Sequence, residues 1–140
     1  MKKIIAILAA VFIGASFLGS VSAEQERGPT IGDCKNPGVT PIIIMYKKGE
    51  LRVQPATAET NLGKVLKFII VGNGDASVNV RGKNVDDLWI AGSAGKGVEM
   101  FYVCVDPDLE IPDPKKGKLF EYFIDVPGVG YLDPEVIVRD

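Results

Sequence analysis

Short apolar runs separated by glycine and proline constrain the fold of this chain more than any other feature. Within residues 24–140 these runs are rich in β-branched side chains, and no long stretch repeats its apolar residues every 3.6 positions. Short strands joined by turns are typical of all-β proteins. The pattern predicts an all-β fold, a Greek-key β-sandwich of about seven strands, in one domain that spans 24–140.

Two of the expected strands stand out by their composition. Residues 41–46 are almost continuously apolar, as expected of a well-covered strand, and 64–71 form the strongest strand of the chain. The remaining expected strands are 51–54, 77–81, 98–105, 119–126 and 134–138. Residues 56–61 are expected to form a helical turn or an irregular crossover, and 92–97 are too rich in glycine to predict regular structure.

The first 23 residues have the pattern of a secretory signal peptide. Two lysines precede the uncharged run 4–18, and the small residues Val21 and Ala23 suit cleavage before Glu24. The alternative is an uncleaved membrane anchor, because 4–23 approaches the ~20 residues that span a bilayer. Small residues in its second half favour cleavage. We therefore expect a periplasmic or extracellular protein with no membrane span after signal cleavage.

Composition excludes several classes of function. The 140 residues include no histidine, which rules out Ser-His-Asp and Cys-His catalysis and the zinc and blue-copper sites that need imidazole. Without the two lysines of the signal, 14 of the 16 basic residues remain against 18 acidic ones, a net charge of −4. A mildly acidic chain without a basic stripe predicts no nucleic-acid partner. We find no catalytic residue set and expect a protein that is not an enzyme.

Cys34 and Cys104 are the only cysteines, and an even number in an exported chain favours a disulfide. Such a bond would close a loop of 70 positions and contribute roughly 4 kcal/mol in the chain-entropy model. The alternative is two separate thiols, with Cys104 buried as a small apolar residue. Both alternatives stay open at this stage.

Two sets of residues offer an alternative function in metal binding. A soft set for Cu(I) would need four sulfur ligands to converge, namely Cys34, Cys104, Met45 and Met100. Met45 and Met100 are instead expected in the core, where thioethers fill gaps well. An acidic loop offers oxygen ligands for weak calcium binding through Asp106, Asp108, Glu110 and Asp113. We favour the absence of a metal or other cofactor.

Two segments resemble cupredoxins. The spacing of Phe68, Val71, Asn73 and Asp75 is similar to the segment in which an apolar strand of that family leads to asparagine and a copper-ligating histidine. Residues 122–138 are similar to the family's closing hairpin. The resemblance implies a cupredoxin-like sandwich.

The same resemblance implies that the type-1 copper site is missing. The family's cysteine, second histidine and methionine would fall near Ile124, at Val129 and near Leu132, and its first histidine near Ser77 or Val78. An immunoglobulin-like strand order is the other possibility, because Tyr102 stands two positions before Cys104, although the spacings of cysteine and tryptophan differ from that family.

Trp89 is the candidate residue for partner binding. Segment 89–95 combines the only tryptophan with several small residues, and aromatic anchors dominate many interfaces. The alternative is that Trp89 plugs one end of the core. The sequence thus predicts an exported non-catalytic module for interaction or structure. Its partner would be an unknown protein or cell-envelope component.

Overall fold

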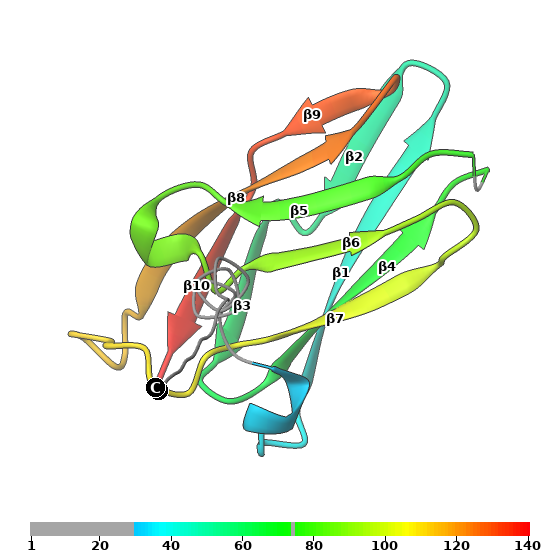
Figure 1. The fold of residues 1–140 in the computed structure, drawn as a ribbon. Coiled ribbons are helices and arrows are strands. Elements are labelled where there is room, and N and C mark those ends of the chain that lie inside the picture. Colours follow the sequence, from blue (N-terminus) through cyan, green and yellow to red (C-terminus); the bar gives the residue numbers. More distant parts are fainter. Residues whose placement is uncertain (1–29, 74) are drawn as a thin grey trace, which may run out of the picture.

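The protein is a sandwich of two β-sheets in the computed structural model, which describes residues 30–73 and 75–140 (Figure 1). The predicted signal peptide lies outside the described residues. One sheet has the order β2 (Glu50–Gln54), β1 (Val39–Lys47), β4 (Val65–Val71), β7 (Met100–Cys104). The other has the order β3 (Thr57–Asn61), β10 (Glu135–Arg139), β8 (Lys118–Val126), β5 (Val78–Gly82), β6 (Ala91–Ala94), and β9 (Gly130–Leu132) also pairs with β8.

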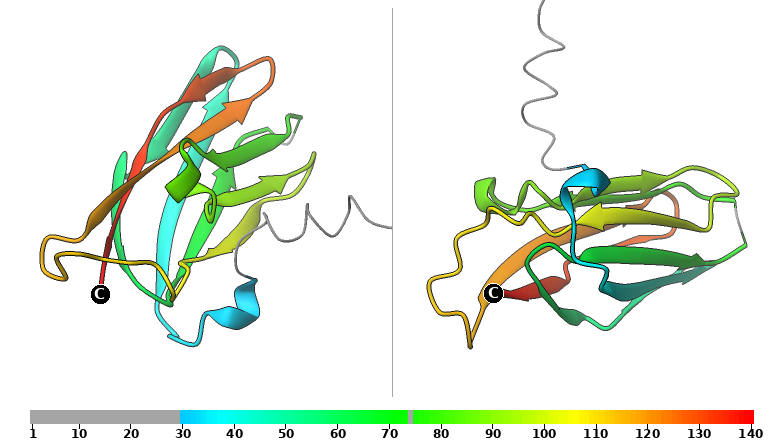
Figure 2. Two further views of the ribbon diagram at one scale, coloured as in Figure 1. Left: turned by 60° about the vertical axis from the view of Figure 1, so that its left-hand side comes forward. Right: turned by 90° about the horizontal axis from the view of Figure 1, so that it is seen from below.

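The all-β sandwich predicted from the sequence is therefore confirmed, with ten strands in the described residues instead of about seven. The two sheets are seen as separate layers in the turned views (Figure 2). Two single 3-10 turns, η2 (Ile31–Asp33) and η3 (Val85–Asp87), are the helical elements of the described part. None of the helices described here is long and apolar enough to cross a membrane.

β3 forms where a crossover was expected. Its polar sequence hid the strand, but Ala58 and Thr60 point inward, while Thr57 and Glu59 face solvent. The hydroxyl of Thr60 is satisfied by a 2.8 Å hydrogen bond with the hydroxyl of Thr40 on β1. β3 pairs along one side only, in parallel with β10, and a polar strand suits such an edge position.

β6 forms where the glycines predicted irregular structure. Gly92 lies opposite Val80 of β5, and a Cβ atom there would lie 2.5 Å from the ring of Phe101. The glycine is therefore needed for the close approach of β6 to β7, and it does not mark a loop. β9 was missed because three residues are too few to show a period.

The core lies between the two sheets and is built around aromatic pairs. Phe68 of β4 and Tyr122 of β8 meet edge to face, with ring centroids 5.9 Å apart. Trp89 and Phe120 form a second edge-to-face pair at 5.3 Å. The first pair joins the two sheets, and the second packs the turn before β6 on β8 of the same sheet; such pairs add about 0.5–1.5 kcal/mol beyond area burial.

The Tyr122 hydroxyl and Trp89 Nε1 are buried in this core and have no hydrogen-bond partner among the described residues. Burial raises the pKa of Tyr122 above its usual value because the phenolate would be desolvated. An unfolded tyrosine ionises near pH 10, so the folded form binds its proton more tightly and stability falls as pH rises above about 10.

We predict that Tyr122→Phe leaves the free energy of unfolding unchanged or raises it by up to about 1 kcal/mol, because it removes an unsatisfied buried hydroxyl. It should also reduce the loss of stability above pH 10. The matched control is Tyr46→Phe, which should cost about 1 kcal/mol because the Tyr46 hydroxyl accepts a hydrogen bond from the Ala76 amide. Urea unfolding measures both, and a loss above 1 kcal/mol for Tyr122→Phe would contradict the assignment.

Candidate interaction surface

The outer face of the four-stranded sheet is apolar across three adjacent strands. β1 and β4 run in parallel, with Ile43 opposite Ile69 and Met45 opposite Val71, and β7 places Met100 beside Ile69. Partners in register share one face of a sheet. We call this surface the apolar face: Val39, Pro41, Ile43, Met45, Val65, Ile69, Val71, Met100 and Tyr102.

Several side chains of the apolar face are open to solvent. Val39 is 52% exposed, Val71 54%, Met100 41% and Tyr102 47%. Among the paired residues of β1, β4 and β7 that form this face, Lys67 is the one charged residue. It lies on β4, between Pro41 of β1 and Tyr102 of β7. A sheet face open to water normally carries polar residues, so this composition is typical of a surface that meets another apolar surface.

The other sheet shows the expected contrast on its outer face. Its outward residues include charged and polar side chains on four strands, among them Glu59, Arg139, Glu121 and Arg81. Arg139 pairs with Glu59, and Lys83 binds Asp133 at 3.0 Å. This sheet also exposes Leu119 (47%) and Tyr131 (55%) on its outer face, so it mixes apolar and charged side chains, whereas three adjacent strands of the four-stranded sheet carry one charge in their paired rows.

A hollow of about 500 Å³ adjoins one end of the apolar face. Its lining joins apolar side chains to an ion cluster at the β1–β2 turn: Met45, Tyr46, Lys47, Glu50, Arg52, Val71, Gly72 and Asn73. Hydrogen bonds from Lys47 and Arg52 lower the pKa of the Glu50 carboxyl. Glu50 balances one of the two cations, so the hollow joins its apolar residues to a cluster with a net charge of +1.

Met45 and Met100 point outward on the apolar face. The expectation of core positions was wrong for Met100, which is substantially exposed, and Met45 is only half-buried. The reason is strand alternation, since the inward positions beside them are taken by Tyr46 and Phe101.

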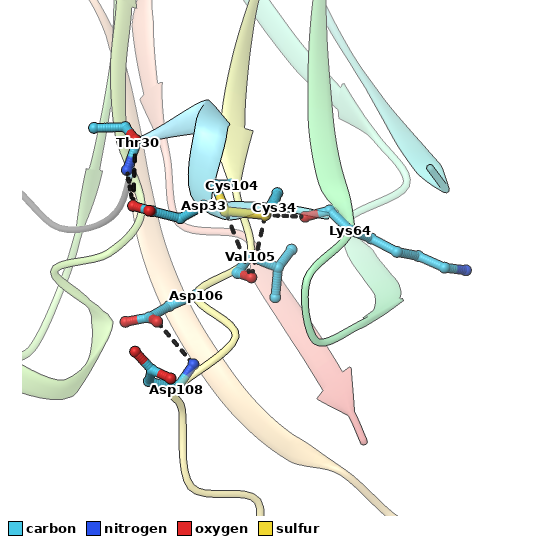
Figure 3. Close-up of a disulfide and its surroundings, with 8 residues drawn as sticks. All are labelled: Thr30, Asp33, Cys34, Lys64, Cys104, Val105, Asp106 and Asp108. Carbon is cyan, nitrogen blue, oxygen red and sulfur yellow. Dashed lines mark hydrogen bonds between the residues drawn. A yellow bond between two sulfur atoms is a disulfide. The ribbon is translucent and has the colours of Figure 1, made fainter. Parts of the chain in front are cut away.

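Cys34 and Cys104 form a disulfide, with their Cα atoms 5.6 Å apart (Figure 3). The disulfide prediction is confirmed, and it ties the η2 segment to the end of β7. The Cys34 sulfur lies 3.0 Å from the Lys64 carbonyl oxygen; this is a sulfur–oxygen contact, because a disulfide sulfur has no hydrogen to donate. The bond also takes both thiols out of the proposed Cu(I) set.

The acidic loop uses its carboxylates locally. Asp106 accepts a hydrogen bond from the Asp108 amide at 2.9 Å, as Figure 3 shows, and Asp113 accepts bonds from the amides of Lys115 and Lys116. Such contacts stabilise turns. Within residues 30–73 and 75–140, no three histidine, cysteine, aspartate or glutamate side chains are grouped to hold a metal ion.

Trp89 lies in the core, where it is 6% exposed and packs on Phe120. The expectation of an exposed anchor in segment 89–95 therefore does not hold. The positions aligned with copper ligands are also packing residues: Ile124 and Val78 are buried, and Val129 and Leu132 pack against the core.

The apolar face was missed in the sequence, although a signal for it was present. The nearly continuous apolar run 41–46 predicted a well-covered strand, and 64–71 was predicted as the strongest strand of the chain. In the described part of the chain their inner face is covered by the second sheet, and their outer face is covered at the Val65 end by the Cys34–Cys104 disulfide.

Comparisons with known proteins found likeness in solved structures only. No protein-family model matches the chain, and no curated protein matches it. A purple cupredoxin from Nitrosopumilus maritimus is 12% identical, with a TM-score of 0.47, over 71% of this chain and 98% of that one. Auracyanin A, a "blue" copper protein from Chloroflexus aurantiacus, is 14% identical, with a TM-score of 0.44, over 73% of this chain and all of that one.

The chain is similar to these two solved structures at low sequence identity. Likeness at these identities and scores carries no information about ligands, activity or partners. The architecture stands on the strand order and register described above.

We predict that the double variant Cys34→Ala, Cys104→Ala loses about 4 kcal/mol of unfolding free energy, because its unfolded chain is no longer restrained by a 70-residue loop. Urea unfolding of the variant and of the oxidised wild type gives the difference. The wild type measured with a thiol reductant should approach the variant. A difference below 1 kcal/mol would contradict this role of the bond.

Proposed function

We propose that the protein is an exported, non-catalytic interaction module that binds its partner through the apolar face. The observation that carries the proposal is the contrast between the two outer faces of one sandwich. One carries ion pairs beside the exposed Leu119 and Tyr131, and the other exposes Val39, Val71, Met100 and Tyr102 around a single lysine. Apolar patches of this kind mark interaction sites.

Export is supported by two independent features. The N-terminal sequence has the order of a signal peptide, with cleavage expected before Glu24. The disulfide between Cys34 and Cys104 belongs to an oxidising compartment such as the periplasm or the cell exterior.

A binding role fits the chemistry of the surface better than a catalytic one. The chain has no histidine, and the apolar face presents one amine and no carboxylate in its rows. General acid–base catalysis needs a titratable group beside a substrate pocket, and no such group is supplied by these rows. The partner is therefore a protein or another cell-envelope component with an apolar surface, and not a nucleic acid.

The proposal predicts where partners contact the protein in the exporting cell. A photo-crosslinking amino acid at position 69, in the centre of the apolar face, should give covalent adducts. The control is the same amino acid at position 137, because Ile137 is a half-buried, outward residue in the middle of β10 on the polar sheet. Equal adducts at both positions, or none at 69, would contradict the proposal.

The same preparation tests export and the absence of a metal. We expect a mature chain that begins at Glu24, with its cysteines oxidised and with less than about a tenth of an equivalent of copper or calcium after purification without chelator. Intact-mass and elemental analysis measure these quantities. One equivalent of either metal would overturn the non-metal assignment.

A further inference from the structure

We infer that the protein binds a neutral, hydroxyl-rich ligand, a pyranose ring of an oligosaccharide, in a hollow on the outer face of the six-stranded sheet. This site lies on the opposite sheet from the apolar face and does not depend on it. The hollow has a volume of about 490 Å³, within the ~300–1,000 Å³ that is usual for ligand sites. We call it the aromatic hollow; its lining includes Asn79 and Arg81 of β5, Phe123 and Asp125 of β8, and Tyr131 of β9.

Two aromatic rings supply a stacking surface in the aromatic hollow. Phe123 and Tyr131 lie with their ring centroids 5.2 Å apart and their ring planes at 36°. Tyr131 is 55% exposed, because the pairing of β9 with β8 places it beside Asp125 on the outer face. The negative face of an aromatic ring attracts the partly positive C–H groups on the apolar side of a sugar ring. The exposed pair therefore suits a flat, partly apolar ligand.

Polar side chains with free hydrogen-bonding groups lie beside these rings. Asn79 and Asp125 are opposite each other in the β5–β8 register, and Arg81 is opposite Phe123. The three polar side chains are exposed, and they make no hydrogen bond or ion pair within the described part of the chain. A carboxylate only accepts hydrogen bonds, a guanidinium only donates them, and an amide does both. Sugar hydroxyls satisfy all three, because each hydroxyl donates and accepts.

The charges at the aromatic hollow disfavour an ionic ligand. Arg81 and Lys83 lie over the Phe123 ring, 5.6 and 5.7 Å from its centroid, so they repel a ligand cation from that ring. Asp125 lines the same hollow and repels an anion. Lys83 is paired with Asp133 at 3.0 Å, and the remaining two charges of the lining, on Arg81 and Asp125, cancel. The lining therefore favours a neutral polar ligand.

The strands of the aromatic hollow disfavour an extended peptide as the ligand. β5 is paired with β6 and β8, and β8 is paired with β5 on one side and with β9 and β10 on the other. Peptides that bind sheets commonly add a strand at an open edge, where main-chain groups are unpaired. Since the two central strands are paired on both sides, recognition relies on side chains. This arrangement suits a small ring that carries its own donors and acceptors.

An NMR titration of the amide signals of the mature protein tests the inference. The probes are the neutral disaccharides cellobiose, maltose, lactose and N,N′-diacetylchitobiose. At least one should shift the signals of Asn79, Phe123 and Tyr131 in a saturable way, with Kd on the order of 1 mM, because an open hollow leaves part of the ligand in water. Choline chloride and sodium phosphate, the ionic probes, should bind at least about tenfold more weakly.

Substitutions test the role of each side chain. Tyr131→Ala should raise Kd at least about tenfold, whereas Tyr131→Phe should change it less than about threefold, because the ring remains. Asp125→Ala should raise Kd about tenfold through loss of a hydrogen bond to a charged acceptor. Leu119→Ala is the matched control, since Leu119 is exposed on the outer face of the same strand and outside the lining; it should leave Kd within about twofold.

The amide spectrum of each variant without sugar shows whether it is folded. The inference would be overturned if none of the disaccharides gave a saturable shift, or if choline or phosphate bound more tightly than the sugars. Equal losses of affinity in Tyr131→Ala and Leu119→Ala, or shifts centred on the apolar face, would also overturn it. None of these results bears on the proposed function, which is tested by crosslinking from position 69 on the other sheet.

Discussion

The parallel pairing of β1 with β4 is the constraint on which the rest of the structure depends. It places the two most apolar strands of the chain side by side in the middle of one sheet, with seven residues in register. Their inward residues, such as Ile42 and Phe68, are fully buried against the second sheet. Their outward residues are nearly as apolar, so the pairing creates the core and the apolar face at the same time.

The sequence predicted those strands whose own residues form short apolar runs bounded by turn residues. All seven expected strands are present in the described residues. β3 and β6 could not be found this way, because their strand form depends on neighbours far along the chain. Thr60 is inward because it meets Thr40, and Gly92 is required by the ring of Phe101.

The candidate site was harder to predict than the fold, for a physical reason. An apolar run shows that a strand can be covered on two faces, but it does not say whether the covering comes from the same chain. For Trp89 the sequence left both a core and an interface role open, with the core role favoured, because tryptophan serves both. The structure places it in the core, where Phe120 of β8 packs on it.

A strand that is apolar on both faces raises the question of what fixes its register. A slip by one residue normally moves polar side chains into the core, and for β1 and β4 this penalty is small at most positions. Lys67 is the exception on β4, since a slip would bury its charge at a cost of several kcal/mol. On β7, the disulfide holds Cys104 facing outward beside Val65. The charge and the cross-link together define which face of this sheet becomes core and which stays free to bind.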